Sequence, residues 1–170
     1  MKIRKTQNID RSHVAEIYRS VSQETEGIPR RLHEITETYI FSLLNKKEDE
    51  IVSLVAEDEE GKLLGVIHAT KNGLESYTHI LSDLTIIIRP EAQGKGVAKA
   101  LGYHVLNYIR DHRPDVWRLE VEAISKLDHL DIFYAAGFVK EGEIKNRIRN
   151  IDGSFSDSVL LVWFNPNFKA

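Results

Sequence analysis

The chain has 170 residues, with 26 acidic and 23 basic side chains and a formal net charge of −3 at neutral pH. Its lysines and arginines are interleaved with acidic residues and form no basic tract, which argues against a nucleic-acid-binding protein. Cysteine is absent, so disulfides, thiolate metal sites and a cysteine nucleophile are excluded.

The sequence also lacks the signals of a membrane or secreted protein. No apolar run is long enough to cross a bilayer, and the polar start, Met1 to Lys5, has no signal-peptide core. We therefore expect a cytoplasmic protein. No repeat or linker divides the sequence, which predicts a single domain over residues 1–170. The seven histidines show no metal-ligand spacing, so we predict no metal.

The first half of the chain predicts one strand, two helices and a strand hairpin. Asp10 or Ser12 can cap the first helix, whose apolar stripe is Val14, Ile17, Tyr18 and Val21. Pro29 suits the first turn of the second helix. From the N-terminus these elements are a strand over residues 2–5, a helix over about 10–23, a helix over about 29–44, and strands over 51–57 and 63–70.

The second half predicts alternating strands and helices that end in a hairpin. Gly137 follows an apolar helical stripe and is a good residue to end that helix. The elements are a strand over 78–88, a helix from 97 to before Pro114, a strand over 118–122, a helix over about 127–136, and strands over 138–149 and 156–164. The order β-α-α-β-β-β-α-β-α-β-β predicts an α/β (α+β) fold, in which helices flank a mixed, twisted central sheet of about six or seven strands.

The most informative segment is Gln93-Gly94-Lys95-Gly96-Val97-Ala98, between a strand and a helix. Backbone N–H groups at a helix N-terminus bind anions, and glycine lets the main chain approach a phosphate closely. Lys95 and Lys99 add positive charge. The segment therefore predicts a site for a cofactor that carries a pyrophosphate. It matches neither the P-loop nor the Rossmann spacing, because Gly96 follows Lys95 and position 99 is lysine.

Gln93, Gly96 and Ala98, together with the later segment Phe133 to Phe138, resemble the GCN5-related N-acetyltransferase (GNAT) superfamily. The resemblance covers about residues 50–165. It implies that the glycine turn wraps the pyrophosphate of acetyl-CoA and that the preceding strand contacts its pantetheine arm. The cofactor-binding residues implied in this way are Ile86, Ile87, Ile88, Gln93, Gly94, Lys95, Gly96, Val97, Ala98, Lys99, Ser125 and Phe133. The family commonly has asparagine where this chain has Leu127, and Ser125 and Asp128 are the nearby polar side chains.

Acetyl transfer to an amine needs an acid for the departing thiolate and a base for the amine. The resemblance implies that Tyr134 is the acid, since a phenol is protonated at neutral pH. The alternative is a core aromatic on the stripe of Leu127 and Leu130. The base stays open among three carboxylates, Asp83, Glu120 and Glu122, of which Asp83 and Glu122 are predicted as catalytic. His79 is a more remote candidate, and Glu24 or Glu26 could recognise a substrate ammonium.

We therefore expect an acetyl-CoA-dependent N-acetyltransferase. It would act on a primary amine of a small molecule or peptide by direct attack in a ternary complex. Its partners would be acetyl-CoA and the amine, with no nucleic acid and no membrane, and a homodimer is an open alternative. The competing hypothesis is a non-catalytic acyl-CoA-binding sensor or structural domain.

Overall fold

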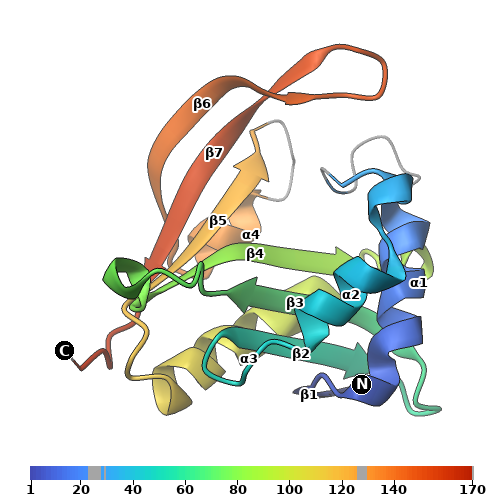
Figure 1. The fold of residues 1–170 in the computed structure, drawn as a ribbon, viewed down its shortest axis with the longest axis horizontal. Helices are drawn as coiled ribbons and strands as arrows, with labels where there is room; N and C mark the ends of the chain where they lie inside the picture. The colour runs from blue at the N-terminus through green and yellow to red at the C-terminus, as the bar shows by residue number, and fades with distance from the viewer. Residues whose placement is uncertain (23–27, 29, 126–129, 170) are drawn as a thin grey trace. The chain divides into compact units, whose positions relative to one another are not determined.

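The computed structural model describes residues 1–22, 28, 30–125 and 130–169 (Figure 1). Its element order confirms the predicted β-α-α-β-β-β-α-β-α-β-β order and the mixed α/β class. The elements are β1 (Lys2–Lys5), α1 (Arg11–Ser22), α2 (Glu37–Leu44), β2 (Ile51–Glu57), β3 (Leu63–Thr70), β4 (Ile80–Ile88), α3 (Val97–His112), β5 (Arg118–Ile124), α4 (Leu130–Ala135), β6 (Val139–Arg149) and β7 (Phe155–Phe164).

The strands form one seven-stranded sheet in the order β1-β2-β3-β4-β5-β7-β6. Pairing is antiparallel between β1 and β2, between β5 and β7 and between β6 and β7, and it is parallel between β4 and β5. The chain separates into two compact units. Unit 1 comprises Met1–His68 and Thr85–Val105, and unit 2 comprises Ala69–Leu84 and Leu106–Ala170. The single domain expected from the sequence stays a prediction.

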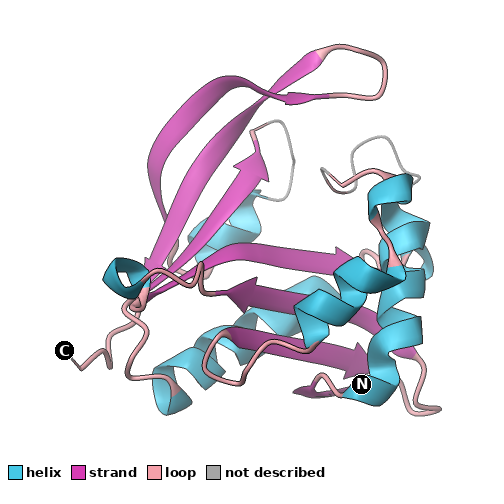
Figure 2. Ribbon diagram, in the orientation of Figure 1, coloured by secondary structure: helices cyan, strands magenta, loops and turns pink. Residues whose placement is uncertain are grey.

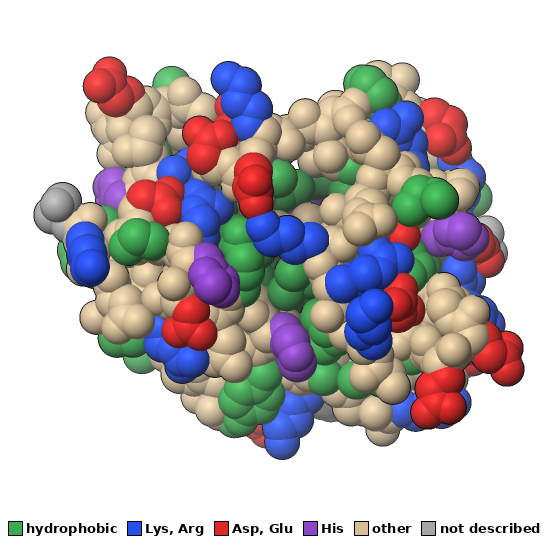
Figure 3. Space-filling model, turned by 90° about the horizontal axis from the view of Figure 1, so that it is seen from below, with side chains coloured by type: hydrophobic (Ala, Val, Ile, Leu, Met, Phe, Trp, Pro, Cys, Tyr) green, Lys and Arg blue, Asp and Glu red, His purple; other side chains and the backbone are tan. Residues whose placement is uncertain are grey.

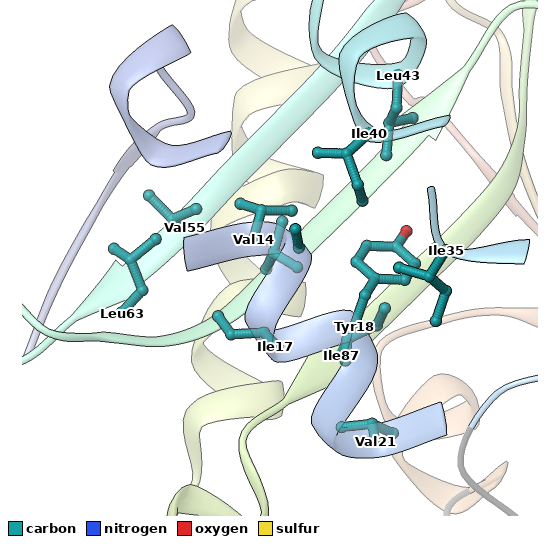
Figure 4. Close-up of a cluster of buried hydrophobic side chains, with 12 residues drawn as sticks. Val14, Ile17, Tyr18, Val21, Ile35, Ile40, Leu43, Val55, Leu63 and Ile87 are labelled. Carbon is teal, nitrogen blue, oxygen red and sulfur yellow. The ribbon is translucent and has the colours of Figure 1, made fainter. Parts of the chain in front are cut away.

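The core of unit 1 lies between its sheet and the two N-terminal helices. Figures 1 and 4 show α1 and α2 on one face of the strands, with the first half of α3 on the other. The stripe predicted for the first helix is confirmed, since Val14, Ile17, Tyr18 and Val21 are all at most 5% exposed. Each such side chain stabilises the fold by about 1.5–3 kcal/mol on burial. They pack with Ile35, Ile40, Leu43, Val55, Leu63 and Ile87 (Figure 4).

The prediction that the second helix begins near Pro29 is wrong. Helix α2 begins at Glu37, after an isolated 3-10 turn over Leu32–Glu34. Thr36 is extended and its side chain accepts a hydrogen bond from the N–H of Tyr39 at 3.1 Å. The Thr36 cap pairs the Tyr39 N–H, which a longer helix would pair with one of its own carbonyls. The cap therefore fixes the start of α2 at Glu37. Pro29, Glu24 and Glu26 lie outside the described residues.

A chain of polar side chains runs through the core of unit 1. The Tyr18 hydroxyl contacts His68 Nε2, the Tyr39 hydroxyl lies 3.4 Å from that of Tyr18, and the Arg30 guanidinium lies 3.9 Å from the Tyr39 ring centroid. His68 is 3% exposed, and its Nδ1 is buried without a hydrogen bond to any described residue. Burial, followed by the positive charge of Arg30, lowers the pKa of His68 to about 4.

The buried His68 predicts a loss of stability in mild acid. Its folded-state pKa lies below the ordinary value of 6.5, so the unfolded chain binds this proton first. The His68 contribution is complete above pH 6.5 and is lost as the pH falls toward 4, up to about 3 kcal/mol. Urea unfolding at pH 7, 5.5 and 4 should show this loss in the wild type and a smaller one in His68→Gln. Parallel pH profiles for the two proteins would contradict the assignment.

Unit 2 is built on three antiparallel strands, and Figure 2 shows β6 and β7 as a long hairpin. Leu119 and Val121 of β5 are buried, and they pair with Trp163 and Leu161 of β7. Glu120 and Glu122, which alternate with them along the strand, are less buried. Trp117 precedes β5, is 45% exposed, and lies against Phe164 and Phe168 with ring centroids 5.7 and 5.8 Å away.

Candidate functional site

The predicted pyrophosphate turn lies wholly in unit 1. It connects the 3-10 turn Pro90–Ala92 to α3, which begins at Val97 as predicted. Gly94 and Gly96 have φ of 72° and 79°, a left-handed conformation that glycine adopts without a steric penalty. The N–H of Ala100 donates to the Gly96 carbonyl at 3.0 Å. The amides of residues 97–99 therefore precede the hydrogen-bond ladder of the helix, where an anion is favoured.

The turn is open to solvent. Gln93, Gly94, Lys95 and Gly96 are exposed. A Cβ atom placed on either glycine would have no atom of the chain within 4 Å. Beside the turn, the last residues of β4, Ile86 to Ile88, supply backbone groups from the same unit. The structure therefore brings ten of the twelve predicted cofactor residues together around one turn.

A buried arginine holds the strand that leads into this turn. Arg89 is 6% exposed; its Nε donates to the Leu63 carbonyl at 2.7 Å and its Nη1 to Glu16 Oε1 at 2.8 Å. Its own N–H donates to the Leu64 carbonyl at 2.9 Å. These bonds connect the end of β4 to β3 and α1. Sequence reasoning missed the role of Arg89, although an arginine between an apolar strand and a proline was a visible signal.

Tyr134 lies in unit 2 on α4, whose end is a Schellman motif. Gly137 has φ of 91°; its N–H donates to the Tyr134 carbonyl, and the N–H of Phe138 donates to the Phe133 carbonyl, both at 3.0 Å. The rings of Phe133 and Phe138 meet edge-on at 5.4 Å, which is the apolar contact typical of this motif. Tyr134 itself is 42% exposed, so the alternative of a core aromatic is not supported.

The left-handed end of α4 gives a direct stability prediction. Gly137→Ala should lower the free energy of unfolding by about 1–2 kcal/mol, because any Cβ is strained at this φ. The added Cβ would lie 3.7 Å from Trp163 Cδ1, an ordinary contact, so backbone strain is the main cost. Denaturant unfolding measures the change.

Gly102→Ala is the matched control, since Gly102 lies inside α3 with open space around it. It should be neutral or stabilising by up to about 1 kcal/mol. Equal effects of the two substitutions would contradict the role given to Gly137.

The three predicted carboxylate candidates for the base lie in different settings within unit 2. Asp83 is exposed and has φ of 55° in the middle of β4, a strained conformation that Asp tolerates better than most residues. Glu122 Oε1 accepts from Ser158 Oγ at 2.7 Å and from Arg147 Nε at 3.1 Å. Glu120 pairs with Arg118 at 2.7 Å, which favours a structural role for it.

The remaining predicted residues also lie in unit 2. The Ser125 N–H donates to the Asp157 carbonyl at 2.9 Å, directly after β5. Phe133 packs in the Schellman motif described above. The ring of His79 lies 6.0 Å from that of Trp117, at the start of β4. Leu127 and Asp128 lie outside the described residues.

Figure 3 shows basic, acidic and apolar side chains interspersed over the face that it draws. Over the described ranges, no three histidine or acidic side chains are grouped closely enough to bind a metal ion. Over the same ranges, no helix combines the length and apolar character needed to span a membrane.

Residues 14–138 match the model of the acetyltransferase (GNAT) family. The chain therefore belongs to this family, which confirms the resemblance found in the sequence. A curated relative, the UPF0157 protein YqkA of Bacillus subtilis, is 31% identical over 88 residues. That match covers 51% of this chain and 23% of the relative, so it spans under a quarter of that protein's length.

Solved structures share the fold at low sequence identity. The protein yncA from Salmonella typhimurium, solved with its cofactor acetyl-CoA, has a TM-score of 0.87 and 16% identity, covering 100% of this chain and 96% of that one. A phosphinothricin acetyltransferase from Sinorhizobium meliloti in complex with AcCoA has a TM-score of 0.85 and 18% identity, covering 99% and 90%. A ribosomal-protein-alanine N-acetyltransferase from Brucella melitensis has a TM-score of 0.83 and 21% identity, covering 96% and 99%.

Proposed function

We propose that this protein is an acetyl-CoA-dependent N-acetyltransferase that acts on a primary amine of a small molecule or peptide. The observation that carries the proposal is the open turn with two left-handed glycines at the start of α3, in a chain that belongs to an acetyltransferase family. The similar folds of two proteins solved with acetyl-CoA support the same cofactor.

The residues present fit acetyl-CoA, which supplies the acetyl group as a thioester. The amides of residues 97–99 would bind the pyrophosphate, and Lys95 and Lys99 would add charge to that contact. The backbone of Ile86 to Ile88 would hydrogen-bond the pantetheine arm. One strand amide there would donate to the thioester carbonyl oxygen. Gln93 is assigned to the turn itself, where its Nε2 lies 3.4 Å from the Ile88 carbonyl.

The proposed reaction is a direct attack of the amine on the thioester, without an acyl-enzyme. Asp83 or Glu122 accepts a proton from the acceptor ammonium, directly or through a water. The neutral nitrogen forms a bond to the acetyl carbonyl carbon as the carbon–sulfur bond breaks. The Tyr134 hydroxyl donates its proton to the departing thiolate, and the second proton, which the acetylated nitrogen then releases, restores the hydroxyl through water. Ser125 and Phe133 are assigned to cofactor contacts.

Tyr134→Phe separates an enzyme from a sensor. If Tyr134 is the acid, kcat should fall by about 10²–10⁴-fold, the usual contribution of general acid catalysis. Thiol release from acetyl-CoA should be measured over polyamines, amino acids, aminoglycosides and short peptides, with binding followed by the rise in melting temperature on adding coenzyme A. Unchanged turnover in Tyr134→Phe would remove the acid role. Coenzyme A binding without thiol release in the wild type would favour the sensor.

Asp83→Asn and Glu122→Gln should identify the base. Asparagine tolerates left-handed backbone, so Asp83→Asn removes the charge at φ 55° with little added strain. The variant that removes the base should lose kcat by about 10²-fold or more and lose the acidic limb of its pH–rate profile. Glu120→Gln, which removes only the ion pair with Arg118, is the matched control. Retention of both activity and pH profile in the two test variants would contradict both assignments.

A further inference from the structure

Three side chains from three strands of unit 2 meet on one face of the sheet. Strand β7 lies between β5 and β6, yet Glu122 of β5 contacts Arg147 of β6 across it. The residue between them is Ser158 of β7, which is fully buried and donates to the same carboxylate oxygen at 2.7 Å. A larger residue at position 158 would separate the charges, so the short Ser158 side chain allows the contact.

The position of Arg147 depends on an irregularity in β6. The register between β6 and β7 shifts between Ile144 and Ile148, and Asn146 has φ of 52°. Asp157 holds this segment, since its Oδ1 accepts from the Asn146 N–H at 2.8 Å and its Oδ2 lies 3.0 Å from Lys145 Nζ. Bulges redirect side chains and are common beside active sites. Arg147 follows the left-handed residue directly, so its direction is set by a held bulge.

The pair presents two opposite charges to solvent. The Arg147 and Glu122 side chains are 55% and 36% exposed, and their contact is made through Nε at 3.1 Å. The terminal amino groups of the guanidinium are not part of that contact. A guanidinium can therefore donate two parallel bonds to a further carboxylate, while the second carboxylate oxygen of Glu122 can accept from an ammonium.

We propose that Arg147 and Glu122 recognise the acceptor as a free amino acid, with Arg147 binding its carboxylate and Glu122 binding its ammonium. This inference rests on the proposed function and names its substrate class. Arg147 also selects against other amines. A peptide N-terminus has no carboxylate on the carbon that bears the amine, and a polyamine would place a second cation near Arg147.

The matched comparison is a second exposed ion pair of the same unit. Arg110 Nε lies 3.0 Å from Asp111 Oδ1 on α3, with side-chain exposures of 43% and 50%. It resembles the Arg147–Glu122 pair in donor atom, distance and exposure. Arg110→Gln therefore reports the effect of losing a surface ion pair, which is small, without touching the proposed acceptor site.

The test measures thiol release from acetyl-CoA with free L-amino acids and with the corresponding amino-acid amides. Wild type should prefer the free acids. Arg147→Gln should raise KM for free acids about 10- to 100-fold, the effect expected for losing a charge-assisted pair of bonds, and should leave the amides unchanged. Arg147→Lys should recover part of the loss, and Arg110→Gln should match wild type for both acceptors.

Each other outcome overturns the inference. Equal KM changes for acids and amides, or no change for either, would make the Arg147–Glu122 pair a structural contact of the hairpin. If wild type acetylates amides and alkylamines as well as free acids, the inference fails while the proposed function stands. If no amine is acetylated, both fail. If Arg147→Gln lowers the melting temperature, the inference is still tested, because the preference of the wild type for free acids over amides needs no variant.

Discussion

The buried guanidinium of Arg89 is the constraint on which the candidate cofactor turn depends. A charge this poorly exposed is tolerated only when its donors are paired. Here the pairing uses a carbonyl of β3 and the Glu16 carboxylate on α1. The hydrogen bond to Glu16 raises the pKa of Arg89 further above its ordinary value, so the charge persists at all working pH values. The 3-10 turn Pro90–Ala92 starts one residue later and leads directly into the glycine turn at Gln93. The position of the glycine turn is therefore fixed from both the sheet and the first helix.

Left-handed backbone recurs at the residues assigned to function. In the described residues, the non-glycine residues with positive φ are Asp83 and Asn146, and both lie within strands. The first is a candidate base, and the second immediately precedes Arg147. Gly94, Gly96 and Gly137 shape the cofactor turn and the helix that carries Tyr134. Strained backbone persists where surrounding contacts over-determine it, and such positions concentrate in functional sites.

Local patterns in the sequence were enough to predict the element order, the buried stripe of α1, the start of α3 and the left-handed Gly137. These features depend on short-range periodicity and on glycine chemistry, which are visible in one sequence. The start of α2 was missed because Pro29 is a favourable first-turn residue, whereas the Thr36 cap decides the boundary. The Glu122–Arg147 contact could not be predicted at all, since it requires the spatial strand order β5-β7-β6 and a bulge that no periodicity reveals.

The contacts among Tyr18, His68 and Tyr39 limit which substitutions these three positions can accept during evolution. The three residues come from α1, β3 and α2. Inside the core of unit 1, the Tyr18 hydroxyl contacts both His68 Nε2 and the Tyr39 hydroxyl, and the two tyrosine rings pack edge-on. Replacing one alone leaves a buried polar group unpaired, at a cost of about 1–3 kcal/mol, whereas replacing all with apolar residues of similar volume removes the cost. Sequence drift at these positions should therefore proceed by coordinated exchange, so that the three sites change as a set.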